Sequence, residues 1–249
     1  KLLDNHWYFQ VFYTGNLKGN HSHHYRYLTS LAEVKTDALK KWTREQKLAF
    51  WINAYNAFTI QTILERYPIK SRSLIGIFSP KNSILQISGV WTRLKFDVGG
   101  QRLTLGQIEH DILRKKFDEA RIHFAIVCAS RSCPVLRSEA YRADSIDRQL
   151  EAQTLQFIND PDRGVRWDAV KRRLYLSKIF KWFRADFKKQ VSTGNVSGSS
   201  QKTENPLLVF IRPYLTGQPI KDALGDGQEI RVSYLHYDWR LNDSAENRT

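Results

Sequence analysis

The sequence predicts an α+β fold, a single domain with a buried central helix, several packed helices and a small mixed or antiparallel sheet. Three observations predict it. A capping box at 43–46 (Thr-x-x-Gln) opens a long segment that is apolar almost all round. A second capping box at 104–107 opens a helix with one apolar arc. Short apolar runs separated by turn residues, as on either side of Gly99-Gly100, are typical of strands.

The composition is that of a globular protein. The 249 residues are 41% hydrophobic and 12% aromatic, which is enough to bury a sizeable core. We expect residues 1–39 to be an N-terminal extension packed on a single globular unit of residues 40–249. The chain starts at Lys1 and contains no Met, so we expect a processed or trimmed form without its targeting segment. A secreted or periplasmic location fits this expectation, and no apolar run is long enough to cross a bilayer.

The net charge of +14 predicts an attraction to anions. The positive charge is densest at 171–173 and around 178–189. No zinc-finger spacing, RNA-binding aromatic motif or basic zipper accompanies it, so we expect no specific nucleic-acid partner. The charge is interpreted as a solvated basic surface, with an anionic surface or polymer as a candidate partner.

Two polar features mark the first sixty residues. His21, His23 and His24 lie in a segment predicted to be an exposed loop, where we expect no functional metal site. The helix predicted for 44–66 carries Asn53 and Asn56 on its most apolar side. A buried amide needs hydrogen-bond partners, so these two either tie down neighbouring loop backbone or line a polar cleft.

The helix predicted for 104–117 contains a carboxylate in an unusual place. Glu109 lies in the middle of its apolar arc, although glutamate is rarely buried unless it is paired. Arg114, Arg121 and His123 are candidate partners. Glu109 therefore serves either a functional cleft or a structural ion pair.

The C-terminal half predicts further helices and a second hairpin. Asp144 is expected to cap a helix that ends near Pro161, Ser177 to cap another, and Pro206 to begin a third. Residues 165–176 read as a hairpin and 194–203 as a Gly/Ser-rich linker or mobile loop. Strand-like residues follow at 231–235.

The stretch 121–136 holds both cysteines of the chain and a histidine. The apolar run 122–128 predicts a buried strand. Pro134 is typical of a first helical position, which makes Cys133 the predicted N-cap of a helix. A thiol at that place faces free backbone N–H groups and the helix dipole, and both favour the nucleophilic thiolate. Alternatively, Cys128 is a small buried hydrophobe, or the two cysteines form a strained disulfide.

Several segments in one order resemble domain-of-unknown-function family 547 (DUF547) over roughly residues 40–242. The segments are AFWINAYNAF at 49–58, LTLGQIEHDILR at 103–114, RIHFAIVCASRSCPVL at 121–136, SKIFKWF at 177–183 and YDWRLN at 237–242. The motif set is also similar to papain-like or transglutaminase-like cysteine enzymes. On such a fold the order of His123 before Cys133 implies a permuted arrangement.

The first functional hypothesis is a cysteine-dependent acyl-transfer enzyme, a hydrolase or transferase acting on a peptide-like or small-thiol substrate. Cys133 is the predicted nucleophile, His123 the base and Glu109 the orienting carboxylate. Backbone N–H groups of 133–136 are expected to stabilise an oxyanion. No cofactor and no metal are expected.

Four residues are alternatives for these roles. Cys128 is the second candidate nucleophile, His110 the second candidate base, and Asn53 and Asn56 are alternative orienting residues. The competing hypothesis is a non-catalytic binding or interaction module of unknown ligand, whose polar cleft holds a peptide or small thiol. The oligomeric state is left open.

Overall fold

The fold is arranged around the helix α4 (Arg44–Leu64), which was predicted for 44–66. The computed structural model describes residues 21–70, 80–193 and 205–243. Thr43 and Gln46 exchange both hydrogen bonds of the predicted capping box. Fifteen residues of α4 are buried, so the prediction of a buried central helix is confirmed.

Two short helices and a hairpin accompany α4. The helices are α2 (His21–Glu33) and α3 (Thr36–Lys41), and the antiparallel strands are β1 (Lys95–Val98) and β2 (Gln101–Thr104). Gly99 and Gly100 both adopt positive φ, as a tight two-residue turn requires. The hairpin prediction is confirmed. The exposed-loop prediction at 21–24 is wrong, because these residues begin α2 and His24 is buried.

The second capped helix is present, and its middle is wider than an α-helix. Thr104 and Gln107 exchange the capping-box hydrogen bonds. The π-helix η3 (Gln107–Leu113) follows and continues into α5 (Arg114–Phe117). Its i→i+5 pattern is visible where the Arg114 N–H donates to the Glu109 carbonyl. Such turns are rare and occur frequently at functional sites.

The prediction of a strand at 122–128 is wrong. Its first half is the one-turn helix α6 (Ile122–Ala125), after which the chain is extended from Ile126. The apolar run is buried, as predicted, but a short apolar run does not distinguish a buried strand from a buried helical turn. The next helix, α7 (Ile146–Ile158), has Ser145 rather than the predicted Asp144 at its N-cap position.

The C-terminal half contains the second sheet, which is mixed. Strands β3 (Val165–Asp168) and β4 (Arg173–Leu176) pair antiparallel, and β5 (Arg231–Tyr234) pairs parallel with β4. Ser177 caps its helix as predicted, and the helix predicted to begin at Pro206 does so, with Asn205 at its N-cap. The predicted linker 194–203 lies outside the described residues. The remaining elements are η2 (Ile84–Gln86), α8 (Lys178–Trp182), α9 (Arg184–Ser192), α10 (Pro206–Ile211), η4 (Arg212–Tyr214) and α11 (Gln218–Gly225).

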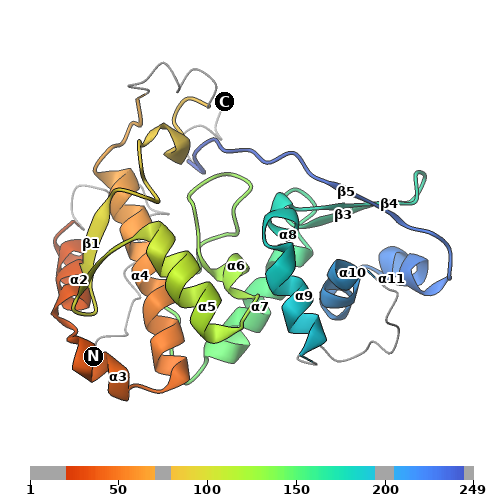
Figure 1. Ribbon diagram of the computed structural model, residues 1–249. Helices are drawn as coiled ribbons and strands as arrows, with labels where there is room; N and C mark the ends of the chain where they lie inside the picture. The colour runs from red at the N-terminus through yellow and green to blue at the C-terminus, as the bar shows by residue number, and fades with distance from the viewer. Residues whose placement is uncertain (1–20, 71–79, 194–204, 244–249) are drawn as a thin grey trace.

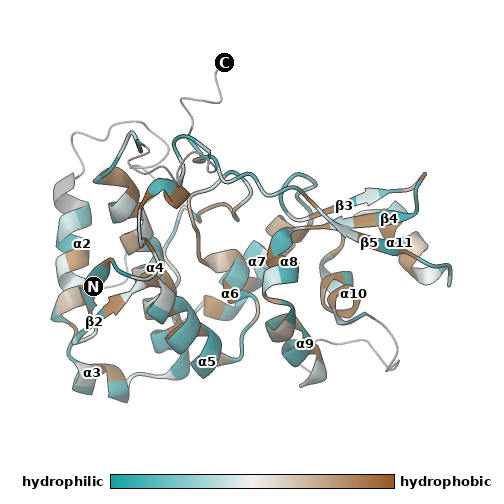
Figure 2. Ribbon diagram, turned by 45° about the horizontal axis from the view of Figure 1, so that its top comes forward, coloured by the Kyte–Doolittle hydropathy of each residue, from teal (hydrophilic) through white to brown (hydrophobic). Residues whose placement is uncertain are grey.

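Helix α6 lies between two hydrophobic clusters. Ile122 and Ala125 pack in the cluster around α4, whereas Phe124 packs in the cluster formed with α8, α9, α10 and the mixed sheet. Figure 1 shows α6 and α7 between these two halves of the molecule. Apolar residues continue from α6 into the loop that follows it, and they dominate α10 (Figure 2). The loop after α6 is therefore anchored at the junction of the two halves.

The two buried asparagines of α4 hold loop backbone. The Asn53 amide donates to the Tyr141 carbonyl over 2.8 Å and accepts from the Tyr141 N–H over 3.0 Å. Asn56 donates to the Ala125 carbonyl and accepts from the Val127 N–H, each over 2.9 Å. These bonds confirm the interpretation that the amides tie down neighbouring loops. Within the described part of the chain, no helix combines the length and apolarity of a bilayer-spanning segment.

The amide clamps predict a measurable loss of stability on truncation. Asn53→Ala and Asn56→Ala should each lower the free energy of unfolding by about 2 kcal/mol, because each leaves buried backbone groups without partners. Urea unfolding followed by circular dichroism measures the change. Gln61→Ala is the matched control on α4: its hydrogen bond to Glu65 is exposed, and a change within about 0.5 kcal/mol is expected. Unchanged stability of Asn56→Ala would contradict the clamp.

Candidate functional site

The loop that leaves α6 presents Cys128 in a fixed position. The Asn56 clamp on Ala125 and Val127 holds the chain on α4 up to the residue before the cysteine. Ala129 then takes a left-handed conformation with φ of 59°, which turns the chain sharply. Both the approach to Cys128 and the turn after it are set by backbone constraints.

Cys128 is a residue of intermediate exposure, and its thiol has two hydroxyl groups within hydrogen-bonding distance. Its Sγ lies 3.2 Å from Ser130 Oγ and 3.4 Å from the Tyr237 hydroxyl. The hydrogen bond from Cys133 is the largest influence on the Cys128 pKa, which is lowered to about 6 even though burial opposes the charge. The Ser130 backbone N–H and the two hydroxyls lower it further. At neutral pH this thiol is therefore mostly thiolate, the nucleophilic form.

Cys133 has the opposite character. It is 4% exposed, and its Sγ lies 2.9 Å from the Cys128 backbone N, which donates to it. Burial, and then the neighbouring Cys128, raises the pKa of Cys133 well above its ordinary value. Cys133 is thus the protonated partner of the pair, and both cysteines are free thiols.

The helix predicted to begin at Cys133 is absent, and that prediction is wrong. The chain from 134 to 140 is irregular, and the Cys133 N–H instead closes a turn on the Ser130 carbonyl over 3.1 Å. Two hydrogen bonds join Ser132 to Asp238. The Ser132 N–H donates to the Asp238 carbonyl, and the Asp238 N–H donates to the Ser132 hydroxyl. A segment distant in sequence therefore supplies hydrogen-bond partners to the backbone of this turn, where the N-terminus of a helix had been expected.

That distant segment consists of residues 237–242, here called the strap. It crosses the loop from Cys128 to Cys133, here called the cysteine loop. The Arg131 N–H donates to the Arg240 carbonyl and the Asn242 N–H to the Ala129 carbonyl. The strap also brings in Tyr237, whose hydroxyl lies 3.2 Å from Ser130 Oγ. Sequence reasoning assigned no role to Tyr237 or Ser130. The available signal was the YDWRLN motif at the strap, one of the segments that carry the family resemblance.

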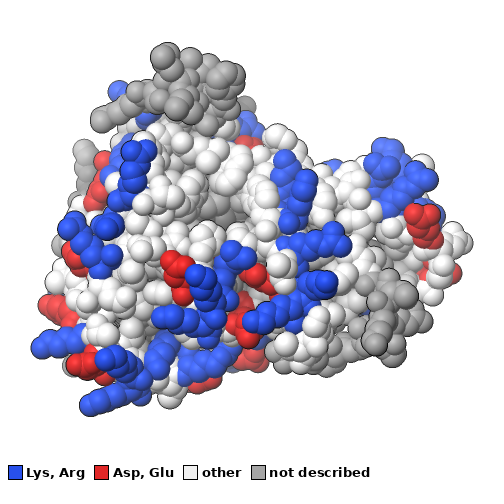
Figure 3. Space-filling view, in the orientation of Figure 1, with Lys and Arg blue, Asp and Glu red and all other residues white. Residues whose placement is uncertain are grey.

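Aromatic side chains lie beside the thiols. Tyr237, Trp239 and Trp182 form a mutual cluster with ring centroids 4.7 to 5.7 Å apart, and Trp182 is 45% exposed. The cysteine loop runs between α4 and α8 in Figure 1. In the same orientation, Figure 3 shows the surface hollowed in this region, with Lys and Arg side chains around it. Cys128 thus lies beside an aromatic cluster, through its contact with the Tyr237 hydroxyl.

The predicted base His123 is not bonded to either thiol. It is buried, its Nε2 lies 2.8 Å from Asp186, and its ring stacks on Phe183 at 3.8 Å. Its Nδ1 has no hydrogen-bond partner within the described residues. Burial lowers the pKa of His123, which favours the neutral ring. Asp186 also pairs with Arg114 through two hydrogen bonds, so His123 belongs to an ion-pair network.

Glu109 has a phenol as its hydrogen-bond partner instead of the predicted cation. The Tyr55 hydroxyl donates to Glu109 Oε2 over 3.1 Å, and His110 Nδ1 is 3.9 Å from the other oxygen. Arg114 is engaged with Asp186, and Arg121 with Glu119, Asp147 and Glu151. Burial and then the Glu109 charge raise the pKa of Tyr55 well above its ordinary value. The charge of Cys128 also raises the Tyr55 pKa, which indicates that Tyr55 lies near the thiols.

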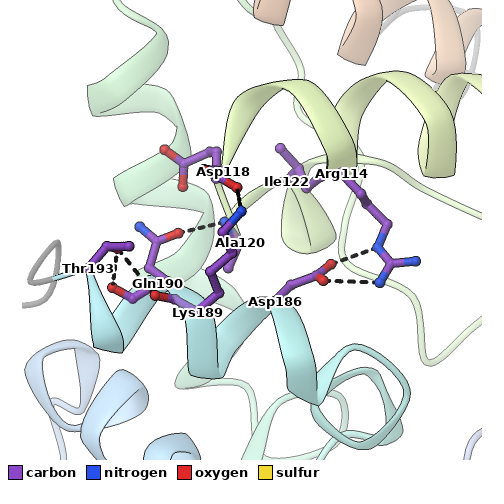
Figure 4. A pocket seen from close by; sticks show the side chains of 9 residues that line it. Arg114, Asp118, Ala120, Ile122, Asp186, Lys189, Gln190 and Thr193 are labelled. Atoms are coloured by element: carbon purple, nitrogen blue, oxygen red, sulfur yellow. Dashed lines mark hydrogen bonds and ion pairs between the residues drawn. The ribbon is translucent and has the colours of Figure 1, made fainter.

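A second concave feature lies between α5, α6 and α9 (Figure 4). Arg114 and Asp186 face each other on one side of it, and Lys189 pairs with Asp118 on the other. Its charges therefore satisfy one another. Across the described ranges 21–70, 80–193 and 205–243, no three His, Cys, Asp or Glu side chains gather as metal ligands do.

Comparison with known families supports the resemblance noted from the motifs. Residues 39–158 match the family described as "Protein of unknown function, DUF547". The DUF547 match covers just under half of the chain and includes α4, both cysteines and α7, whereas the strap lies beyond it. No curated protein and no solved structure matches the chain. Nothing in these comparisons supports the likeness to papain-like or transglutaminase-like enzymes.

The donors around Cys128 predict a pH-dependent difference between the two thiols. With its pKa lowered to about 6, the Cys128 thiol favours the thiolate at pH 7. Its alkylation by iodoacetamide should rise through about pH 6 and level off, while Cys133 stays unlabelled in the folded protein. Tyr237→Phe removes a donor to the thiolate and should move the midpoint upward by roughly one pH unit. Mass spectrometry of labelled tryptic peptides gives both rates.

Tyr141→Phe is the matched control for that measurement. The Tyr141 hydroxyl is buried without a hydrogen-bond partner in the described structure, so its loss should leave the Cys128 midpoint in place. Faster labelling of Cys133 than of Cys128 would reverse the assignment and restore Cys133 as the candidate nucleophile.

Replacing His123 tests whether it acts on the thiols. His123→Ala should cost about 3 kcal/mol of stability, because it opens a cavity and removes a partner of Asp186. Alkylation of Cys128 per folded molecule should stay unchanged, because the thiolate does not depend on this imidazole. Melting temperature and labelling rate are measured on one sample. A stable variant with slow Cys128 labelling would show that His123 is the base after all.

Proposed function

We propose that the protein is a cysteine-dependent acyl-transfer enzyme in which the Cys128 thiolate attacks a carbonyl carbon. The observation that carries the proposal is the Cys128 Sγ, on a residue of intermediate exposure, with the hydroxyls of Ser130 and Tyr237 at 3.2 and 3.4 Å. These donors favour the thiolate without a histidine base. The roles predicted for Cys133, His123 and Glu109 stay predictions, and the geometry favours the second candidate nucleophile.

The same donors fit the charge that develops during the reaction. Attack by Cys128 Sγ forms a carbon–sulfur bond and moves an electron pair to the carbonyl oxygen. The Tyr237 hydroxyl, which accepts a hydrogen bond from Ser130 Oγ, is close enough to Sγ to donate to an oxygen on the adjacent carbon. Their positions are fixed, because Ser130 is 1% exposed and Tyr237 is held in the aromatic cluster.

Among the described residues, no histidine ring is hydrogen-bonded to Cys128, and this favours one class of substrate. An amine leaving group must be protonated as it departs, and His123 is engaged with Asp186 instead. A thiolate leaving group departs without a proton at neutral pH. Thioesters of small thiols therefore fit this centre better than amides do, and hydrolysis or transfer follows according to whether water or a second nucleophile releases the acyl group.

The surface near Cys128 suits an acyl group with apolar or aromatic character. Trp182 is exposed next to Tyr237, at a ring distance of 4.8 Å, and Trp239 packs on both. Aromatic side chains of this kind can bury the apolar surface of an acyl group and can stack on its rings. The cationic surroundings of the hollow favour a substrate that also carries negative charge.

An acyl-enzyme assay tests the proposal. The protein should form a covalent acyl adduct on Cys128 with p-nitrophenyl acetate and with an acyl thioester, seen by intact-protein mass spectrometry and as a burst of product. Cys128→Ser should return the rate to that of the reaction without protein. Cys133→Ser keeps a donor at the site and should still be acylated. An unacylated but folded protein would remove the acyl-transfer proposal and favour the non-catalytic binding module.

A further inference from the structure

We propose that Cys128 and Cys133 also act together, as a dithiol pair that exchanges with small disulfides of the glutathione type and closes into an internal disulfide. This inference rests on the proposed nucleophile Cys128 and adds a role for the buried thiol, which acyl transfer does not use. Cys133 is the resolving thiol in this reaction. Its position behind Cys128 is the observation from which the inference starts.

The loop brings Cys133 Sγ against the backbone of Cys128. Cys133 Sγ lies 2.9 Å from the Cys128 backbone N, which donates a hydrogen bond to it. The turn from Ser130 to Cys133 and the left-handed Ala129 bring the chain back on itself between them. A disulfide requires close approach of the two residues, and this loop provides it.

The two cysteines differ in solvent exposure, and this difference assigns them different steps of the exchange. Cys128 is the more exposed residue of the two, and Cys133 is only 4% exposed, so an external disulfide reaches Cys128 first. The donors that lower the Cys128 pKa to about 6 make it the attacking thiolate at neutral pH, and Cys133 keeps its proton until a mixed disulfide has formed. An exposed, low-pKa thiol in front of a buried, protonated one is the arrangement that dithiol exchange requires.

The exchange balances in two steps. The Cys128 thiolate attacks one sulfur of the external disulfide, forms a mixed disulfide and releases the other half as a thiolate. Cys133 then gives its proton to a released thiolate, attacks Cys128 Sγ and expels the second thiolate. The protein dithiol is oxidised by two electrons to the Cys128–Cys133 disulfide, and the small disulfide is reduced to two thiol groups, one of which carries the proton from Cys133.

Oxidised glutathione provides the test, with the full chain as the protein. The unmodified protein should lose two hydrogens and carry no lasting adduct, and peptide mapping should show a Cys128–Cys133 link. Cys133→Ser should instead accumulate one glutathione on Cys128 as its main product, because no thiol resolves the mixed disulfide. Cys128→Ser is the matched control and should gain neither glutathione nor an internal link.

A time course on the unmodified protein keeps the test decisive if Cys133→Ser fails to fold. Acid quenching should then catch a transient Cys128 adduct that decays into the internal disulfide. A glutathione adduct that persists on Cys128 of the unmodified protein would overturn the dithiol inference, while fast alkylation of Cys128 would leave acyl transfer standing. A Cys128 that reacts with neither glutathione nor iodoacetamide would overturn both proposals.

Discussion

The buried amide of Asn56 is the constraint on which the candidate site depends. Because α4 is buried almost all round, a polar side chain in its middle must find hydrogen-bond partners inside the protein. The amide finds them on Ala125 and Val127, the backbone on either side of the exit from α6. The position of Cys128 thus follows from the need to satisfy a core amide.

The chemistry of the site comes from an asymmetry between two identical side chains. Cys128 and Cys133 are five residues apart, yet donors surround one sulfur and burial protects the other. The strap 237–242 supplies Tyr237, which is more than a hundred residues away in sequence. A thiolate stabilised in this way serves acyl transfer and disulfide exchange equally well, since both begin with the same attack.

The charged residues near the site have a different task. Arg114, Asp186 and His123 form a network that joins α5, α6 and α9, and Phe183 packs on both Arg114 and His123. Each buried charge or ring nitrogen there needs a partner, so the network is explained by the cost of burying polar groups. A histidine and a carboxylate close in sequence to cysteines therefore do not identify a catalytic set by themselves.

The sequence by itself determined the features that depend on local physics: both capping boxes, the Gly99-Gly100 hairpin, the buried α4, the cap at Ser177 and the helix start at Pro206. It also located the 121–136 stretch and the family resemblance. Only the tertiary structure decided whether 122–128 was strand or helix, because burial leaves an equal apolar pattern in both. The structure likewise shows no helix from Pro134 onward, and the turn before it is bound by the strap instead. The difference between the two thiols arises from neighbours distant in sequence, which no local pattern encodes.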